Sequence, residues 1–291
     1  MSGRAVVVTD STASLPPEVA DDHGIVVVPL QVVIGASVYD EGPDGATPTM
    51  VAEALKDFRP VSTSRPAPAY LAEVYADVAA QGATAILSVH LSAQMSGTHE
   101  SALLAARDAP VPVTVVDSRQ VGVATGYAAV SAAEALAAGR TVEDAADAAR
   151  RRADATTTLF YVDTLEYLRR GGRIGAAAAI LGGALSVKPL LRIDDGRVVN
   201  LDRVRTSARA LSRMEDLIVE AAGDLPVDLC VSHLANPDRA TELAGRLGER
   251  LADNLAGRDV WCGELGAVLG AHVGPGMVAV CVAPLLDETG G

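Results

Sequence analysis

A serine and a histidine far apart in the chain, Ser96 and His272, have the chemistry of a nucleophile and a general base. With Asp10 or Asp117 to orient the imidazole, they would form the triad used by many hydrolases and acyltransferases. Ser96, however, lies in Met-Ser-Gly-Thr and not in the Gly-x-Ser-x-Gly elbow of the α/β hydrolases. Its hydroxyl could instead cap a helix or bind an anion, so the residues alone leave these alternatives open.

Several signatures of enzymes are absent from the sequence. It has no Gly-x4-Gly-Lys-Ser/Thr phosphate loop, no Gly-x-Gly-x-x-Gly and no His-Glu-x-x-His, which excludes a P-loop kinase and disfavours a dinucleotide or zinc enzyme. The three cysteines, Cys230, Cys262 and Cys281, are widely spaced, which disfavours a disulfide framework or a zinc site. We therefore expect no metal and no cofactor, and we assign no catalytic residue.

The segment 85–106 predicts a strand, a polar bend and a helix. Residues 85–89 are an apolar run, and from Thr98 onward apolar residues recur at helical spacing. Ser96 is a suitable N-cap for that helix, and the backbone N–H groups at its start, including that of Gly97, would be unpaired. This predicts an anion seat at the carboxyl edge of the strand.

His272 lies in a glycine-rich segment, Leu-Gly-Ala-Val-Leu-Gly-Ala-His-Val-Gly-Pro-Gly-Met over 265–277. We predict a bend followed by the tight turn Gly274-Pro275-Gly276, because glycine allows a positive φ and a close approach of the backbone. An isolated histidine is compatible with a structural role or a functional one.

The order of the elements predicts an α/β fold with two domains. Strands alternate with helices in the first half, which favours a doubly wound, mostly parallel sheet. Two of its strands would deliver Asp-Ser, at 10–11 and 117–118, to the carboxyl edge where such folds bind ligands. The second half combines an Asp-Gly hairpin near 195–196 with separate helices and strands. We predict an N-terminal α/β domain over 1–153 and a C-terminal α+β domain over 154–291.

Some local structure is predicted less directly. Pro66 and Pro68 favour an extended, irregular loop over 62–68 before a helix at 69–80. A single helix is expected over 238–255.

The net charge of the 291-residue chain is −13, and only 3% of its residues are aromatic. Both features disfavour nucleic acid as a partner, and the charge also disfavours anionic membranes. The segment 150–213 is the exception, with 13 lysines and arginines against 6 acidic residues, which favours a docking face for a particular partner. The N-terminal apolar run is too short for a signal peptide, and no stretch is long enough to insert stably in a membrane. We expect a cytoplasmic protein.

Seven motifs in a fixed order resemble the DegV family, bacterial fatty-acid-binding proteins that include the B subunit of fatty acid kinase. They are TDST at 9–12, TSRPAP at 63–68, LSAQMSGT at 91–98, VDS at 116–118, TLEYLRRGGRIG at 164–175, KPLL at 188–191 and GAHVGPGM at 270–277. Each motif is weak alone, but together they cover nearly the whole chain.

The resemblance implies a carrier that buries a long-chain fatty acid and holds its carboxylate between the two domains. The family's carboxylate site corresponds to Thr63, Ser96 and His272, to which we add the Gly97 amide and the Ser11 hydroxyl. A fatty acid kinase ATP-binding subunit would be the partner, docked at Arg170 and Arg205.

Three positions depart from the commoner family pattern. Arg65 replaces a frequent glutamine, Met95 replaces a smaller or aliphatic residue, and Arg203 replaces a lysine whose charge it keeps. The main alternative to a carrier is a hydrolase or acyltransferase that uses Ser96 and His272. A third possibility is a sensor of a small molecule other than a lipid.

Overall fold

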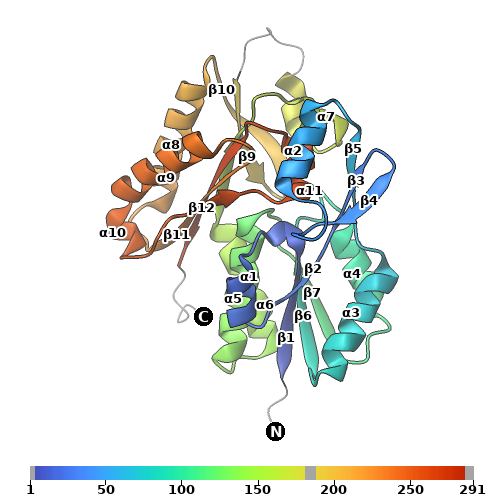
Figure 1. Cartoon of the computed structure of the whole chain (residues 1–291). Coiled ribbons are helices and arrows are strands. Elements are labelled where there is room, and N and C mark those ends of the chain that lie inside the picture. The colour runs from blue at the N-terminus through green and yellow to red at the C-terminus, as the bar shows by residue number, and fades with distance from the viewer. Residues whose placement is uncertain (1–3, 181–187, 286–291) are drawn as a thin grey trace.

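The computed structural model describes residues 4–180 and 188–285, and their strands form three sheets (Figure 1). The first sheet is parallel throughout, in the order β2-β1-β6-β7. Its strands are β1 (Ala5–Asp10), β2 (Val26–Val28), β6 (Ala85–His90) and β7 (Val113–Asp117). Near-continuous apolar runs such as Val6-Val7-Val8 suit a parallel sheet that is buried on both faces.

Helices cover both faces of this parallel sheet. Helices α5 (Val123–Ala137) and α6 (Val142–Ala155) pack on one face, largely through alanines. Helices α3 (Pro68–Ala80) and α4 (Thr98–Ala106) pack on the other, where Leu71 and Tyr75 are fully buried. Shorter helices, η1 (Ser11–Ala13) and α1 (Pro17–Asp22), follow β1. The predicted doubly wound parallel sheet is confirmed.

The second sheet has six strands in the order β10-β9-β8-β13-β11-β12, and it is antiparallel except for the pair β11–β12. The strands are β8 (Thr157–Tyr161), β9 (Lys188–Asp194), β10 (Arg197–Val204), β11 (Val227–His233), β12 (Trp261–Glu264) and β13 (Val278–Pro284). The predicted hairpin turn joins β9 to β10, with positive φ at both Asp195 and Gly196.

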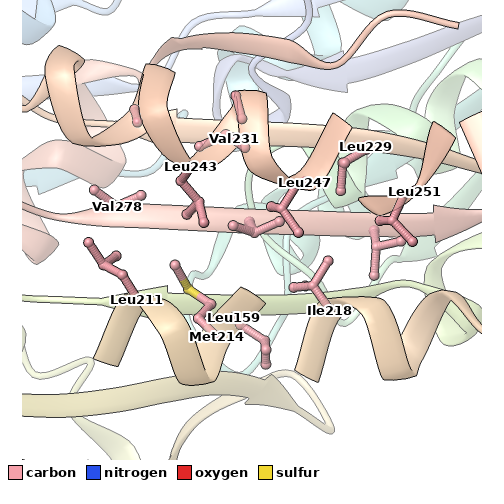
Figure 2. Packing of buried hydrophobic residues seen from close by; sticks show 14 of the residues in the cluster. Leu159, Leu211, Met214, Ile218, Leu229, Val231, Leu243, Leu247, Leu251 and Val278 are labelled. Atoms are coloured by element: carbon pink, nitrogen blue, oxygen red, sulfur yellow. The ribbon is translucent and has the colours of Figure 1, made fainter. Parts of the chain in front are cut away.

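One face of the six-stranded sheet, which we call the closed face, packs against α8 (Ser207–Ala222) and α9 (Pro237–Arg250). Figure 2 shows Leu243 and Leu247 of α9 and Met214 of α8 directed toward the strands. A short helix, α10 (Ala252–Leu255), follows α9 after a break at Leu251. The prediction of a single helix over 238–255 is therefore wrong, because Leu251 leaves the helical conformation and divides it. The predicted end at 255 is confirmed, since Ala256 adopts a left-handed conformation.

The third sheet is a small antiparallel one in the order β4-β3-β5. Its strands are β3 (Gln31–Ile34), β4 (Ser37–Asp40) and β5 (Val61–Ser64), and α2 (Pro48–Lys56) lies between β4 and β5 in sequence. The irregular loop predicted over 62–68 is thus wrong for its first residues. Thr63 pairs with Val32, because the prolines begin only at residue 66 and leave the earlier N–H groups available.

Three further helices complete the described chain: α7 (Glu166–Arg170), η2 (Gly175–Ile180) and α11 (Ala267–Val273). Helix α11 corrects the prediction of a bend over 265–277. Its residues pack with β3 and α2, including Val32, Val51 and Ala271 in one cluster. The predicted domain boundary at 153/154 falls inside α6 and stays a prediction.

Candidate functional site

A cavity of about 420 Å³ lies beside the other face of the six-stranded sheet, which we call the cavity face. Because side chains alternate along a strand, this face carries Thr158, Phe160, Ala279 and Cys281, whereas Leu159 and Val280 point to the closed face. The volume falls within the range of small-molecule sites. The remaining wall comes from segments that precede the six-stranded sheet in the chain and from the helices α7 and α11 that connect its strands. It includes Leu30, Leu91, Met95, Val123, Leu168, Val268, Leu269 and Val273.

Thr63 and His272 meet at this cavity although 209 residues separate them. The Oγ1 atom of Thr63, on β5, is 2.8 Å from Nε2 of His272, at the end of α11. The ring lies over α7's C-terminal turn, where a Cβ on Gly171 would collide with Nδ1. Gly274 has a positive φ and packs against the ring of Tyr167, so a side chain there would also collide. This close packing explains why glycine occupies positions 171 and 274.

His272 is neutral at neutral pH. Burial, with a smaller contribution from the positive charge of Arg173, lowers its pKa from 6.5 to about 4. Its Nδ1 atom is buried and has no hydrogen-bond partner among the described residues. Unpaired buried N–H groups are rarer than under-used acceptors, so we place the ring proton on Nε2. Nε2–H then donates to Thr63, which leaves the Thr63 hydroxyl proton available to a ligand.

Ser96 and Gly97 also line the cavity, at the start of α4. Ser96 Oγ lies 2.8 Å from Thr98 Oγ1 and accepts from the Thr98 N–H at 3.3 Å. The N-cap residue of α4 is Gly97, so the prediction that Ser96 is the N-cap is off by one position. The Gly97 carbonyl accepts from Arg65, whose guanidinium also pairs with Glu100 at 2.7 Å. Arg65 therefore packs over the start of α4, beside the cavity.

Ser11 is not among the residues that line the cavity. Its hydroxyl donates to Glu41 and accepts from the Leu30 N–H at 3.0 Å. The sequence placed it with the other carboxylate ligands because Asp10-Ser11 ends a strand of the parallel sheet. The chain turns into η1 at this point and directs the Ser11 hydroxyl to Glu41.

The catalytic triad of the hydrolase alternative is not assembled. Ser96 contacts Thr98, and His272 contacts Thr63. Asp10 is fully buried, and its Oδ2 accepts from His90 Nδ1 at 2.9 Å. Asp117 accepts instead from the N–H groups of Ala93 and Arg119. Neither aspartate contacts His272, so neither orients its ring.

The sequence of this chain matches a known protein family. A family model described as "Uncharacterised protein, DegV family" matches residues 4–285. This chain belongs to the DegV family. It is 51% identical over 283 residues to a DegV domain-containing protein of Streptomyces coelicolor. The aligned residues cover 97% of this chain and 99% of the relative.

Two solved structures of DegV proteins share the fold. One is a DegV family protein from Thermus thermophilus that is described in terms of its fatty acid binding. It is 32% identical to this chain, with a TM-score of 0.87, and the match covers 97% of this chain and 100% of that one. The other is DegV, a fatty acid binding protein from Bacillus subtilis, with 31% identity and a TM-score of 0.89 over 98% of this chain and 100% of that one.

The sequence did not single out Arg173, which lines the cavity of this DegV family member. Its Nε donates to the Met95 carbonyl at 3.0 Å, and its guanidinium also donates to the Gly171 carbonyl. Arg173 thereby joins the segment after α7 to the segment before α4. The only sequence signal was its place in the Arg-Gly-Gly-Arg motif, two residues after the glycine that packs under His272.

The two arginines predicted to dock a partner lie outside the cavity lining. Arg170, on α7, is exposed and pairs with Glu166 at 2.7 Å. Arg205 is exposed in the bend between β10 and α8. Residues 4–180 and 188–285 contain no cluster of three or more histidine, cysteine, aspartate or glutamate side chains that could hold a metal ion. In the same part of the chain, every helix is too short or too polar to cross a bilayer.

Proposed function

We propose that this protein binds a long-chain fatty acid in the cavity, with the carboxylate beside Thr63 and His272. The observation that carries the proposal is the Thr63–His272 hydrogen bond at the wall of a largely apolar cavity. The Thermus and Bacillus relatives, which are described as fatty-acid-binding, support the choice of ligand.

The proposed carboxylate contacts are hydroxyls, an amide and a guanidinium. The Thr63 hydroxyl would donate directly, and Ser96 and the Gly97 amide would donate from the start of α4. Arg173 would supply the positive charge, because His272 is neutral. A buried carboxylate needs several such donors. The acyl chain would lie along the cavity face, where each buried CH₂ contributes about 0.8 kcal/mol.

The carboxylate site is tested by comparing a fatty acid with the fatty alcohol of equal length. Thr63→Val should weaken binding of the acid roughly tenfold or more, because it removes a donor to a buried charge, and should change binding of the alcohol much less. Ser62→Ala is the matched control, since Ser62 is adjacent on β5 but exposed. Equal losses for acid and alcohol would contradict this placement of the carboxylate.

We further propose that a separate kinase subunit phosphorylates the bound carboxylate. It would transfer the γ-phosphoryl group of ATP to a carboxylate oxygen and release ADP and an acyl phosphate. The acidic protein would meet this partner through its basic segment, with Arg170 and Arg205 in contact. In this scheme Ser96 binds the ligand and has no role as a nucleophile.

The docking proposal is tested with Arg170→Ala and Arg205→Ala. With the cognate kinase and a limiting amount of carrier, both variants should produce acyl phosphate at least about tenfold more slowly, as loss of interface arginines commonly does. Arg192→Ala is the control, because Arg192 is an exposed arginine of the same basic segment. An unchanged rate of acyl phosphate production with both variants would contradict the proposed docking role of these arginines.

A further inference from the structure

Glu41 places a partly buried carboxylate between the end of β1 and the start of α11. Its Oε1 accepts from the Val268 N–H at 2.8 Å, and the Ala267 N–H also bonds to the carboxylate. The other oxygen, Oε2, accepts from the Ser11 hydroxyl. Burial raises the pKa of this carboxyl group above its usual 4.5, and the hydrogen bonds from Ser11 and from the start of α11 oppose that rise.

This carboxylate does for α11 what a local cap would do. The N-cap residue of α11 is Gly266, which has no side chain, and a Cβ at that position would crowd Glu41. The first N–H groups of a helix need acceptors. Glu41, 225 residues earlier than Gly266, supplies them.

Helix α11 is only seven residues long, and it carries much of the cavity wall. Val268, which bonds to Glu41, lines the cavity, as do Leu269 and His272. On the other side of the network, the Leu30 N–H donates to Ser11, and Leu30 also lines the cavity. The network Leu30–Ser11–Glu41–Val268 therefore joins two parts of the wall.

We propose that Glu41 is a positioning residue that holds α11, and through it His272, against Thr63, and that Ser11 acts through Glu41 without touching the ligand. This inference rests on the proposed function only in that the cavity binds a fatty acid beside Thr63 and His272. It assigns a role to the Thr-Asp-Ser-Thr motif that lies outside the cavity.

Fatty acid affinity measured in a double-mutant cycle tests the proposal. Glu41→Ala should weaken binding roughly tenfold, in line with the loss of a helix cap, and Glu41→Gln, which keeps an acceptor for α11, should stay within about threefold of wild type. In a His272→Ala background, Glu41→Ala should add little, because coupled residues are not additive. Ser11→Ala should weaken binding about threefold and add little to Glu41→Ala.

The matched control is Glu264→Gln. Glu264 is an exposed carboxylate two residues before Gly266, so this variant changes the charge near the same helix start without touching the network. It should bind fatty acid as the wild type does. Additive effects in the cycle, or Glu41→Gln as weak as Glu41→Ala, would overturn the proposal.

A second measurement needs no fatty acid, so it separates failure of this inference from failure of the proposed function. NMR titration of His272 in the ligand-free protein reports its pKa. Removing a nearby negative charge alone would lower that pKa, whereas loosening α11 and hydrating the ring would raise it. We expect a rise from about 4 toward 6.5 in Glu41→Ala and little change in Glu41→Gln. An unchanged or lower value in a folded Glu41→Ala would contradict the inference, and Ser11→Ala offers the same test, with a smaller rise, if that variant does not fold.

Discussion

The two faces of the six-stranded sheet are built from the same strands but have different roles. On the closed face, Leu159 and Val280 pack against α8 and α9 in a continuous apolar core (Figure 2). On the cavity face, the alternate residues Thr158, Ala279 and Cys281 border a cavity. The closed face is filled by large aliphatic side chains, whereas several side chains of the cavity face are small or polar.

This difference separates stability from binding within one sheet. Tight packing is what makes a core costly to disturb, so the closed face should determine stability. The cavity face gives up part of that packing and can accept a ligand. Substitutions on the closed face should therefore change the free energy of unfolding, and substitutions on the cavity face should change ligand affinity.

The largest effect is expected on the closed face. Leu243→Ala removes a fully buried side chain of α9, and should lower the free energy of unfolding by about 2–5 kcal/mol, since a cavity is left behind. Denaturant titration measures the loss. The folded variant should bind a fatty acid with an affinity within about threefold of the wild-type value. A strong loss of affinity would show that the two faces are not independent.

An intermediate effect is expected from the titration of His272. Its pKa is about 4 in the folded protein and near 6.5 when unfolded, so between these values the unfolded chain binds more protons. The free energy of unfolding should therefore fall as the pH drops from about 7 to 4, by at most about 3 kcal/mol from this residue. His272→Gln should lack this part of the pH dependence. Parallel pH–stability curves for wild type and variant would contradict a buried, neutral imidazole.

The smallest effect on stability, with a large effect on binding, is expected from Ala279→Leu. This side chain would extend into the cavity, so the free energy of unfolding should change by less than about 1 kcal/mol while fatty acid affinity falls at least about tenfold. The matched control is Val280→Leu, on the same strand but in the closed face. It should cost about 1–3 kcal/mol by overpacking and leave the affinity unchanged. Calorimetric titration and denaturation of both variants distinguish the faces.

Much of the fold could be predicted from local pattern. Alternating strands and helices gave the parallel sheet, and Asp195-Gly196 gave the β9–β10 hairpin, because each signal lies within a few neighbouring residues. The elements that failed depend on distant contacts. Residues 267–273 form α11 although they contain glycine, since the helix is buried against β3 and α2 and capped by Glu41.

The candidate site shows the same limit. The sequence named Thr63, Ser96, Gly97 and His272, and all four line one cavity. It could not show that Ser11 turns toward Glu41, because that contact joins residues that follow strands of two different sheets. It also passed over Arg173, since a motif gives no direction for a side chain whose target, the Met95 carbonyl, is 78 residues away.

The most direct test of the account is mass spectrometry of the purified protein, first under native conditions and then after denaturing extraction. We expect a mass shift close to one ligand per chain, released as a long-chain fatty acid, and a weaker signal from Ala279→Leu prepared in the same way. A protein that carries no lipid and also fails to take up added fatty acids would contradict the central claim.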